Sequence, residues 1–168
     1  MTTDPTLTPD RDHMEQILTR ESIGYLGLSA DGETYVVPLN YTYTPDARIL
    51  FHCALEGRKL DMIRANPRVC FSVSSQAGPP TEHYGELCST PYESVICWGE
   101  ARVIDDLPER QQLLQEFQIR YGTPAKPRES ISLESTAKCG AVEITVTHMT
   151  GRSVHAEERT RWGWERGG

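Results

Sequence analysis

The sequence lacks the features that mark several large classes of protein. No uninterrupted apolar segment approaches the roughly 18 to 20 residues that a helix needs to cross a bilayer, and Met1–Pro5 contains no basic region followed by an apolar run. Neither a GxGxxG motif nor a P-loop occurs, so we expect no Rossmann dinucleotide unit and no phosphate-binding loop of that kind. A cytoplasmic protein that does not span a membrane is the simplest expectation.

Cysteine pairs and histidine clusters are also missing. The five cysteines form no CxxC and no zinc-finger spacing, and an odd number cannot be fully paired within one chain, so we expect reduced thiols in the core. These cysteines are Cys53, Cys70, Cys88, Cys97 and Cys139. The histidines have no mutual spacing suited to a metal ion, and we expect no metal site.

An excess of positive charge is absent as well. The chain has 17 basic and 24 acidic side chains and a net charge of -7, which disfavours nucleic acid and anionic membranes as partners. Any site for an anion must therefore be a local cluster of cations and backbone amides. With 168 residues, the chain is expected to form one domain over 1–168, with tails at 1–7 and 155–168.

The apolar pattern predicts a mainly β protein. Alternation and turn residues predict strands over 22–29, 34–43, 48–53, 69–75, 94–104 and 141–149, the first three forming an antiparallel meander. Helical spacing and capping residues predict helices over 9–20, 56–66 and 105–122. Residues 76–90 are expected to be a long exposed connection that borders a binding site. Because strands and helices do not alternate, we expect a six-stranded antiparallel barrel, closed or partly closed, with two or three flanking helices.

One part of this pattern looks like a cradle for a flat ligand with an anionic tail. Pro38 interrupts the strand Val36–Tyr41, the strand 48–53 ends at His52 and Cys53, and a Gly-Arg-Lys step then opens the second helix. Strand ends offer backbone groups to a flat ring, and a helix N-terminus attracts an anion. Taken alone, Arg58 and Lys59 are also compatible with solvent-exposed basic residues at the start of a helix. Pro38 is also compatible with an edge strand that the proline protects from pairing with another chain.

These segments carry a resemblance to a known family. The chain resembles the pyridoxamine 5'-phosphate oxidase-like family of FMN-binding split barrels, and within it the Nim-type branch linked to nitroimidazole resistance. The matching segments are Val37–Tyr41, Phe51–Ala54, Gly57–Lys59, Asn66–Phe71 and Tyr92–Val103. The resemblance implies a split β-barrel that forms a homodimer, with FMN in a groove shared by the two subunits.

The resemblance also implies which residues bind the cofactor. Arg58 and Lys59 would hold the FMN phosphate, and Gly57 would allow its close approach to the backbone. The remaining cofactor-binding candidates are Val37, Pro38, Leu39, Asn40, His52, Cys53, Ala54 and Ser94. The arginine-glutamine pair of true pyridoxamine phosphate oxidases is absent at Glu93 and Ser94, so we do not expect activity on pyridoxamine phosphate.

His52 is the candidate catalytic residue, because a histidine at a strand end could deliver a proton during reduction of a nitro or carbonyl group. The alternative is a structural histidine. Cys53 is adjacent in the strand and so points to the opposite face, which excludes a Cys-His nucleophile. Trp98 either stacks on a ligand or fills the core.

The resulting hypothesis is an FMN-dependent oxidoreductase that reduces a small planar substrate, with nitroaromatics as one candidate class. The alternative is a non-catalytic protein of the same fold that binds a flavin, a haem or a deazaflavin. A third interpretation is a barrel scaffold whose dimer surface is its function. The sequence favours none of these three by a single diagnostic motif.

Overall fold

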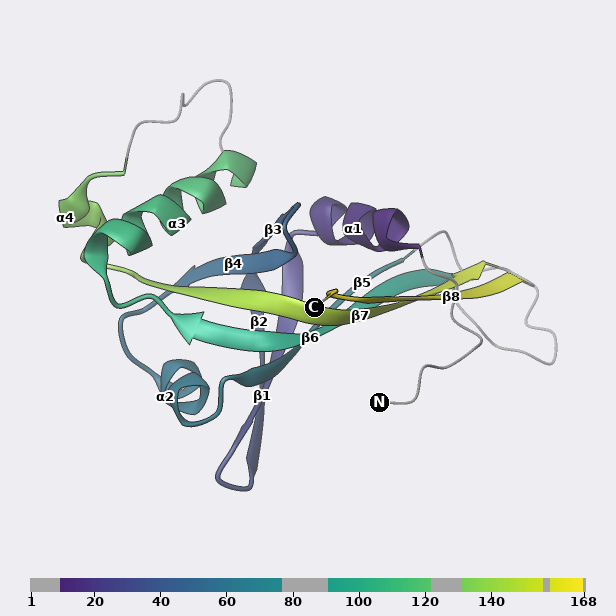
Figure 1. The fold of residues 1–168 in the computed structure, drawn as a ribbon, viewed down its shortest axis with the longest axis horizontal. Coiled ribbons are helices and arrows are strands. Elements are labelled where there is room, and N and C mark those ends of the chain that lie inside the picture. The colour runs from purple at the N-terminus through teal and green to yellow at the C-terminus, as the bar shows by residue number, and fades with distance from the viewer. Residues whose placement is uncertain (1–9, 77–90, 122–130, 156–157, 168) are drawn as a thin grey trace.

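The computed structural model describes residues 10–76, 91–121, 131–155 and 158–167. Its strands are β1 (Ile23–Ala30), β2 (Glu33–Asn40), β3 (Thr42–Thr44), β4 (Arg48–Cys53), β5 (Arg68–Gln76), β6 (Tyr92–Val103), β7 (Gly140–His155) and β8 (Glu158–Glu165). Its helices are α1 (Arg11–Arg20), α2 (Arg58–Ala65), α3 (Leu107–Tyr121) and α4 (Leu133–Thr136) (Figure 1). None of the helices in these described ranges is both long and apolar enough to cross a membrane.

The strands form one antiparallel sheet in the order β2-β1-β5-β6-β7-β4-β3, and β8 pairs with the second half of β7. The first half of β7 pairs with β4, so β7 joins the two ends of the molecule. In Figure 1 the β1–β2 hairpin runs across the direction of β6 and β7, which shows how strongly the sheet bends. The ladder does not close between β2 and β3. The prediction of an antiparallel split β-barrel with flanking helices is therefore confirmed, although the described residues form eight strands instead of six.

One additional strand comes from a break in the expected strand 34–43. Its first part is β2, which pairs with β1 along its whole length, and its last part is β3, which pairs with β4. Tyr41 lies between them, is fully buried, and donates a hydrogen bond from its hydroxyl to the carbonyl oxygen of Leu18 at 2.6 Å. The expected meander is thus divided at Tyr41, and its two parts pair with different neighbours.

The core is formed by the inner face of this sheet together with the buried sides of α1 and α2. Every second residue of β6 is buried, including Val95, Cys97 and Ala101, as the sequence alternation predicted. From α1, the buried side chains are Met14, Ile17 and Leu18. Burial raises the pKa of the Cys97 thiol, and the four cysteines that the structure describes are all unpaired. Of these four, only Cys97 is a core thiol as predicted, because Cys53, Cys70 and Cys139 are half-buried.

Three further predictions differ from the structure. The predicted tail from 155 contains β8, because Trp162 of that strand is buried against the core. The short helix α4 lies between α3 and β7, where the sequence pattern predicted no helix. Helix α1 begins at Arg11 instead of residue 9, because Asp10 caps it with a carboxylate that accepts from the His13 amide at 3.0 Å. The expected connection 76–90 lies outside the described residues except for Gln76, which ends β5.

Candidate functional site

The first candidate site is the N-terminus of α2. The amides of Leu60 and Asp61 donate to the carbonyl oxygen of Gly57 at 2.8 and 3.3 Å, and the amides before them have no partner within a helix. Gly57 has φ +133°, a backbone conformation that favours glycine, and a Cβ added there would meet no atom within 4 Å. The space in front of this helix end is therefore open, as the approach of an anion requires.

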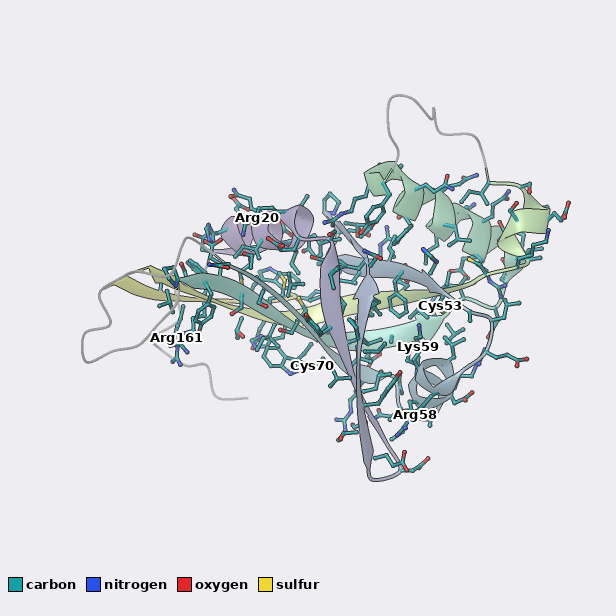
Figure 2. The ribbon with its side chains drawn as sticks, turned by 180° about the vertical axis from the view of Figure 1, so that it is seen from behind. Arg20, Cys53, Arg58, Lys59, Cys70 and Arg161 are labelled. Atoms are coloured by element: carbon teal, nitrogen blue, oxygen red, sulfur yellow. The ribbon has the colours of Figure 1, made fainter. Side chains whose placement is uncertain are left out.

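Arg58 and Lys59 point in different directions from this helix end. Arg58 forms an ion pair with Glu33 of β2 at 2.7 Å, and its guanidinium lies over the Tyr35 ring at 5.1 Å. Burial raises the pKa of the Cys53 thiol at the end of β4, and the positive charge of Lys59 opposes that shift. Figure 2 shows Lys59 and Cys53 on the same side of the molecule. Lys59 is thus better placed than Arg58 to meet an anion at the open helix end.

The end of β4 presents His52 and Cys53 to opposite sides. His52 is exposed, and its ring meets the Phe117 ring of α3 edge-on, with 4.8 Å between the centroids. Cys53 is half-buried and packs against the core. No Cys-His pair can form in this arrangement, as the strand alternation predicted. Ala54 follows Cys53 and is exposed. A Cβ added at Gly140 of β7 would lie only 2.7 Å from the Ala54 carbonyl oxygen, so the backbone of β7 runs close to this strand end.

Strand β2 supplies the next group of predicted residues. Val37 and Leu39 are half-buried and pack against the core, whereas Pro38 and Asn40 are exposed on the outer face. Asn40 donates from its side-chain amide to the carbonyl oxygen of Ser22 at 3.0 Å. Because β2 is the last strand on its side of the sheet, one edge of its backbone is unpaired by a neighbouring strand. The backbone groups of that edge are available to the polar edge of a flat ligand. An edge strand is also where a proline that prevents pairing with another chain is expected, so the structure is compatible with both interpretations of Pro38.

Ser94 is separated from the rest of the predicted site within one chain. It lies near the start of β6, opposite Ser74 of β5 and Arg152 of β7. Helix α2 instead packs near the other end of β6, where the amide of Ala101 donates to the carbonyl oxygen of Pro67 at 2.8 Å. Seven strand residues span roughly 24 Å. Ser94 thus lies near the opposite end of β6 from the contact with Pro67 that follows α2.

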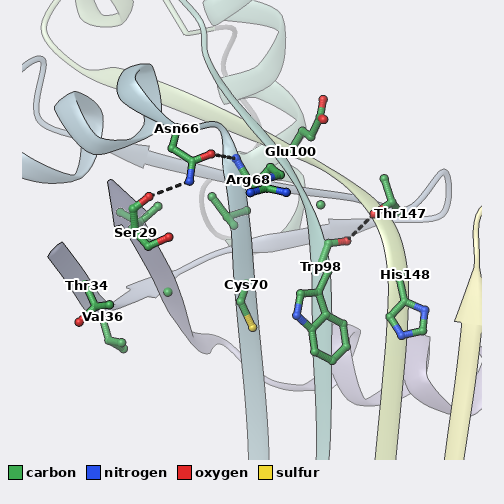
Figure 3. A pocket seen from close by; sticks show the side chains of 14 residues that line it. Ser29, Thr34, Val36, Asn66, Arg68, Cys70, Trp98, Glu100, Thr147 and His148 are labelled. Atoms are coloured by element: carbon green, nitrogen blue, oxygen red, sulfur yellow. Dashed lines mark hydrogen bonds between the residues drawn. The ribbon is translucent and has the colours of Figure 1, made fainter. Parts of the chain in front are cut away.

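A second candidate site, which the sequence motifs did not indicate, is a groove on the outer face of the sheet. It has a volume of about 930 Å³ and is bordered by side chains of β1, β2, β5, β6 and β7 (Figure 3). We call it the outer-face groove, and its principal residues are Val36, Asn66, Arg68, Cys70, Trp98 and His148. Trp98 is 38% exposed, so the interpretation of this residue as core filling was wrong.

A β-bulge shapes one wall of the outer-face groove. Trp98 pairs with His148 and Gly99 pairs with Val146, so Thr147 is an extra residue in β7. The Thr147 hydroxyl donates to the carbonyl oxygen of Trp98 at 3.1 Å. As a result Trp98 and His148 stand side by side, with 5.0 Å between their ring centroids. Bulges of this kind commonly redirect side chains next to a binding site.

The opposite end of the outer-face groove is polar. Asn66 donates to the carbonyl oxygen of Ser29 at 2.8 Å and accepts from the amide of Arg68 at 3.2 Å. Arg68 and Glu100 are opposite each other on β5 and β6. In the part of the chain that the structure describes, no group of three or more His, Cys, Asp or Glu side chains is placed to bind a metal ion.

Several solved structures resemble this fold. A crystal structure named as a candidate 5-nitroimidazole antibiotic resistance protein from Bacteroides thetaiotaomicron is 27% identical, with a TM-score of 0.73 over 86% of this chain and 84% of that chain. An FAD-binding protein from Mesorhizobium loti is 24% identical, with a TM-score of 0.66 over 87% of this chain and 96% of that one. An FAD and haem binding protein from Mycobacterium smegmatis is 15% identical, with a TM-score of 0.72 over 97% and 77% of the two chains. The last two likenesses concern the fold alone.

Sequence comparison identifies the family. A search of curated proteins finds no match to this chain. The family model described as pyridoxamine 5'-phosphate oxidase, however, matches residues 10–153, which include all strands from β1 to β6 and nearly all of β7. This match confirms the resemblance seen in the sequence motifs: the chain belongs to the pyridoxamine 5'-phosphate oxidase family.

Proposed function

We propose that this protein is an FMN-dependent oxidoreductase that reduces a small planar substrate. The observation that supports FMN binding is the open N-terminus of α2, where Gly57 leaves room for a phosphate and Lys59 supplies a half-buried cation. When bound, the flavin supplies hydride or electron transfer between a donor and the substrate. The likeness to a nitroimidazole resistance protein supports nitroaromatics as a candidate substrate class.

The chain's own residues hold and orient the ligands in this proposal. Lys59 and the first amides of α2 bind the phosphate, and the unpaired edge of β2 at Val37–Asn40 faces the polar edge of the ring. His52 is exposed at the end of β4, where it can give a proton to a reduced substrate. Its contact with Phe117 fixes the imidazole against α3.

The test of the phosphate site is the charge reversal Lys59→Glu. We expect FMN affinity to fall at least about tenfold, because a carboxylate would then repel the phosphate at the helix end. Arg64→Glu is the matched control: it makes the same charge change on the same helix, at the end where Arg64 pairs with Asp105 at 3.1 Å. Equal FMN affinity in the two variants, measured by flavin fluorescence, would show that α2 does not bind the phosphate at its N-terminus.

Spectra and anaerobic mixing test the chemistry. Freshly purified protein should show flavin absorbance, a nicotinamide donor should reduce that flavin, and a nitroaromatic should reoxidise it. A haem or deazaflavin spectrum would favour the alternative ligands. Bound FMN that neither donor nor acceptor affects would identify a flavin-binding protein without turnover.

We also propose that the protein is a homodimer with the cofactor between its subunits. Support comes from the apolar side chains Ile23 and Tyr25, which are 53% and 47% exposed on the outer face, and from Ser94, which lies about seven strand residues along β6 from the contact between Ala101 and Pro67. A second copy on this face would bring its Ser94 toward the flavin. Sedimentation should give twice the mass of the chain at micromolar concentration; a single-chain mass with FMN bound would contradict the shared site.

A further inference from the structure

We propose that Glu33 sets how tightly the α2 terminus binds the flavin phosphate, because it holds the Arg58 guanidinium away from that terminus while no phosphate is bound. This role rests on the proposed function, in which Lys59 and the first amides of α2 bind the phosphate. Glu33 is the first residue of β2 and directly follows the turn of the β1–β2 hairpin. It is a residue that the sequence motifs did not indicate.

Two contacts hold Arg58 to the hairpin. Its Nη2 lies 2.7 Å from Oε2 of Glu33, and its guanidinium lies over the Tyr35 ring, 5.1 Å from the ring centroid (Figure 2). Tyr35 packs against the core, whereas Thr34 and Val36 line the outer-face groove. Because alternate residues of a strand point to opposite faces, Glu33 shares the core side of β2 with Tyr35. The contact with Arg58 is therefore separate from the outer face on which a second copy is proposed to bind.

The position of Arg58 in the helix brings its side chain within reach of the phosphate. Arg58 is the first residue of α2, so its side chain leaves from the same turn as the amides that would bind the anion. The space in front of Gly57, the residue before it, is open. A guanidinium binds a phosphate best through two parallel N–H donors, and Arg58 must turn away from Glu33 to present them. Glu33 and the phosphate therefore compete for one side chain.

The exposure of the ion pair decides which anion wins this competition. The side chains of Arg58 and Glu33 are 56% and 69% exposed, and ion pairs between side chains as exposed as these are weak. The phosphate is a dianion at a helix N-terminus, so its contact with Arg58 is the stronger of the two. Flavin binding can therefore break the ion pair, and the loss of that pair lowers the flavin affinity by a modest factor.

The experiment compares FMN with riboflavin, which has the same ring and no phosphate, by flavin fluorescence in the full chain at about 0.15 M salt. We expect Glu33→Gln to tighten FMN binding about threefold and to leave the weaker binding of riboflavin unchanged. In an Arg58→Gln background the same substitution should change FMN affinity by less than about 1.5-fold, because no guanidinium remains to be released. Glu134→Gln is the matched control: it removes the same charge and breaks an ion pair of 2.7 Å with Lys138, and it should change neither affinity.

Unchanged or weaker FMN binding by Glu33→Gln would overturn the role of Glu33. An equal gain for riboflavin would show that Glu33 acts through the position of β2, and an equal gain in the Arg58→Gln background would show that it repels the phosphate directly. Selectivity for FMN that depends on Lys59 and not on Glu33 would leave the proposed function intact. An unaltered chain that binds FMN no more tightly than riboflavin would instead overturn both proposals, since no phosphate would then lie at the α2 terminus.

Discussion

Gly99→Ala is expected to lower the free energy of unfolding by at least about 3 kcal/mol, since it forces an extra carbon into a closed contact. A Cβ at position 99 would lie 2.1 Å from the carbonyl oxygen and 2.9 Å from the carbonyl carbon of Thr145. Both atoms belong to the backbone of β7, so no side-chain rotation can relieve the clash. The two central strands would have to separate at the bulge that holds Thr147.

Gly27→Ala is the matched control for this substitution. It makes the same change on β1, where the added Cβ would lie 3.3 Å from the carbonyl oxygen of Cys70. A shift of a few tenths of an ångström accommodates that contact, so we expect a loss of about 1 kcal/mol or less. Urea unfolding followed by circular dichroism measures both. Similar midpoints for the two variants would contradict the close approach of β6 and β7 at Gly99.

Most of the fold follows from short-range patterns, but two of its strands do not. Alternation correctly identified the buried side of β6, because one side of a strand faces the core along its whole length. The break at Tyr41 depends on a hydrogen bond to Leu18, which lies 23 residues earlier. Strand β8 depends on its pairing with β7 and on the burial of Trp162, neither of which appears in the charged sequence around it. Long-range contacts of this kind override local propensity.

The candidate sites also have one part that short-range patterns predict and another that depends on long-range contacts. The α2 terminus could be predicted because Gly57, Arg58 and Lys59 are adjacent in the chain. The turn of Arg58 toward Glu33 could not, because the partner lies 25 residues away on β2. The outer-face groove is assembled from five strands, and only their register places Trp98 beside His148. The one local signal was an aromatic residue on the polar side of an alternating strand, at Trp98.

Trp162→Ala is expected to lower the free energy of unfolding by about 3 to 5 kcal/mol, the usual cost of removing a buried tryptophan. Trp162 is 6% exposed, and its ring fills the space beside Gly151 of β7, where an added Cβ would meet it at 2.7 Å. On its other side it contacts the His13 ring of α1, with 4.4 Å between the centroids. His13 Nε2 in turn lies 3.1 Å from the Glu93 carboxylate of β6. One side chain of β8 thus joins α1 to the sheet.

Trp164→Ala on the same strand separates the burial of Trp162 from a general loss of aromatic surface. Trp164 is half-buried, and the guanidinium of Arg11 lies over its ring at 4.7 Å. We expect this control to cost about 1 to 2 kcal/mol, because less apolar area is removed from a partly solvated position. Urea unfolding gives the free energy of unfolding of both variants, compared at an unchanged slope m of that free energy against urea concentration. If Trp162→Ala costs no more than Trp164→Ala, then β8 does not hold α1 in place, and residues 158–165 would be the tail that their charge pattern indicated.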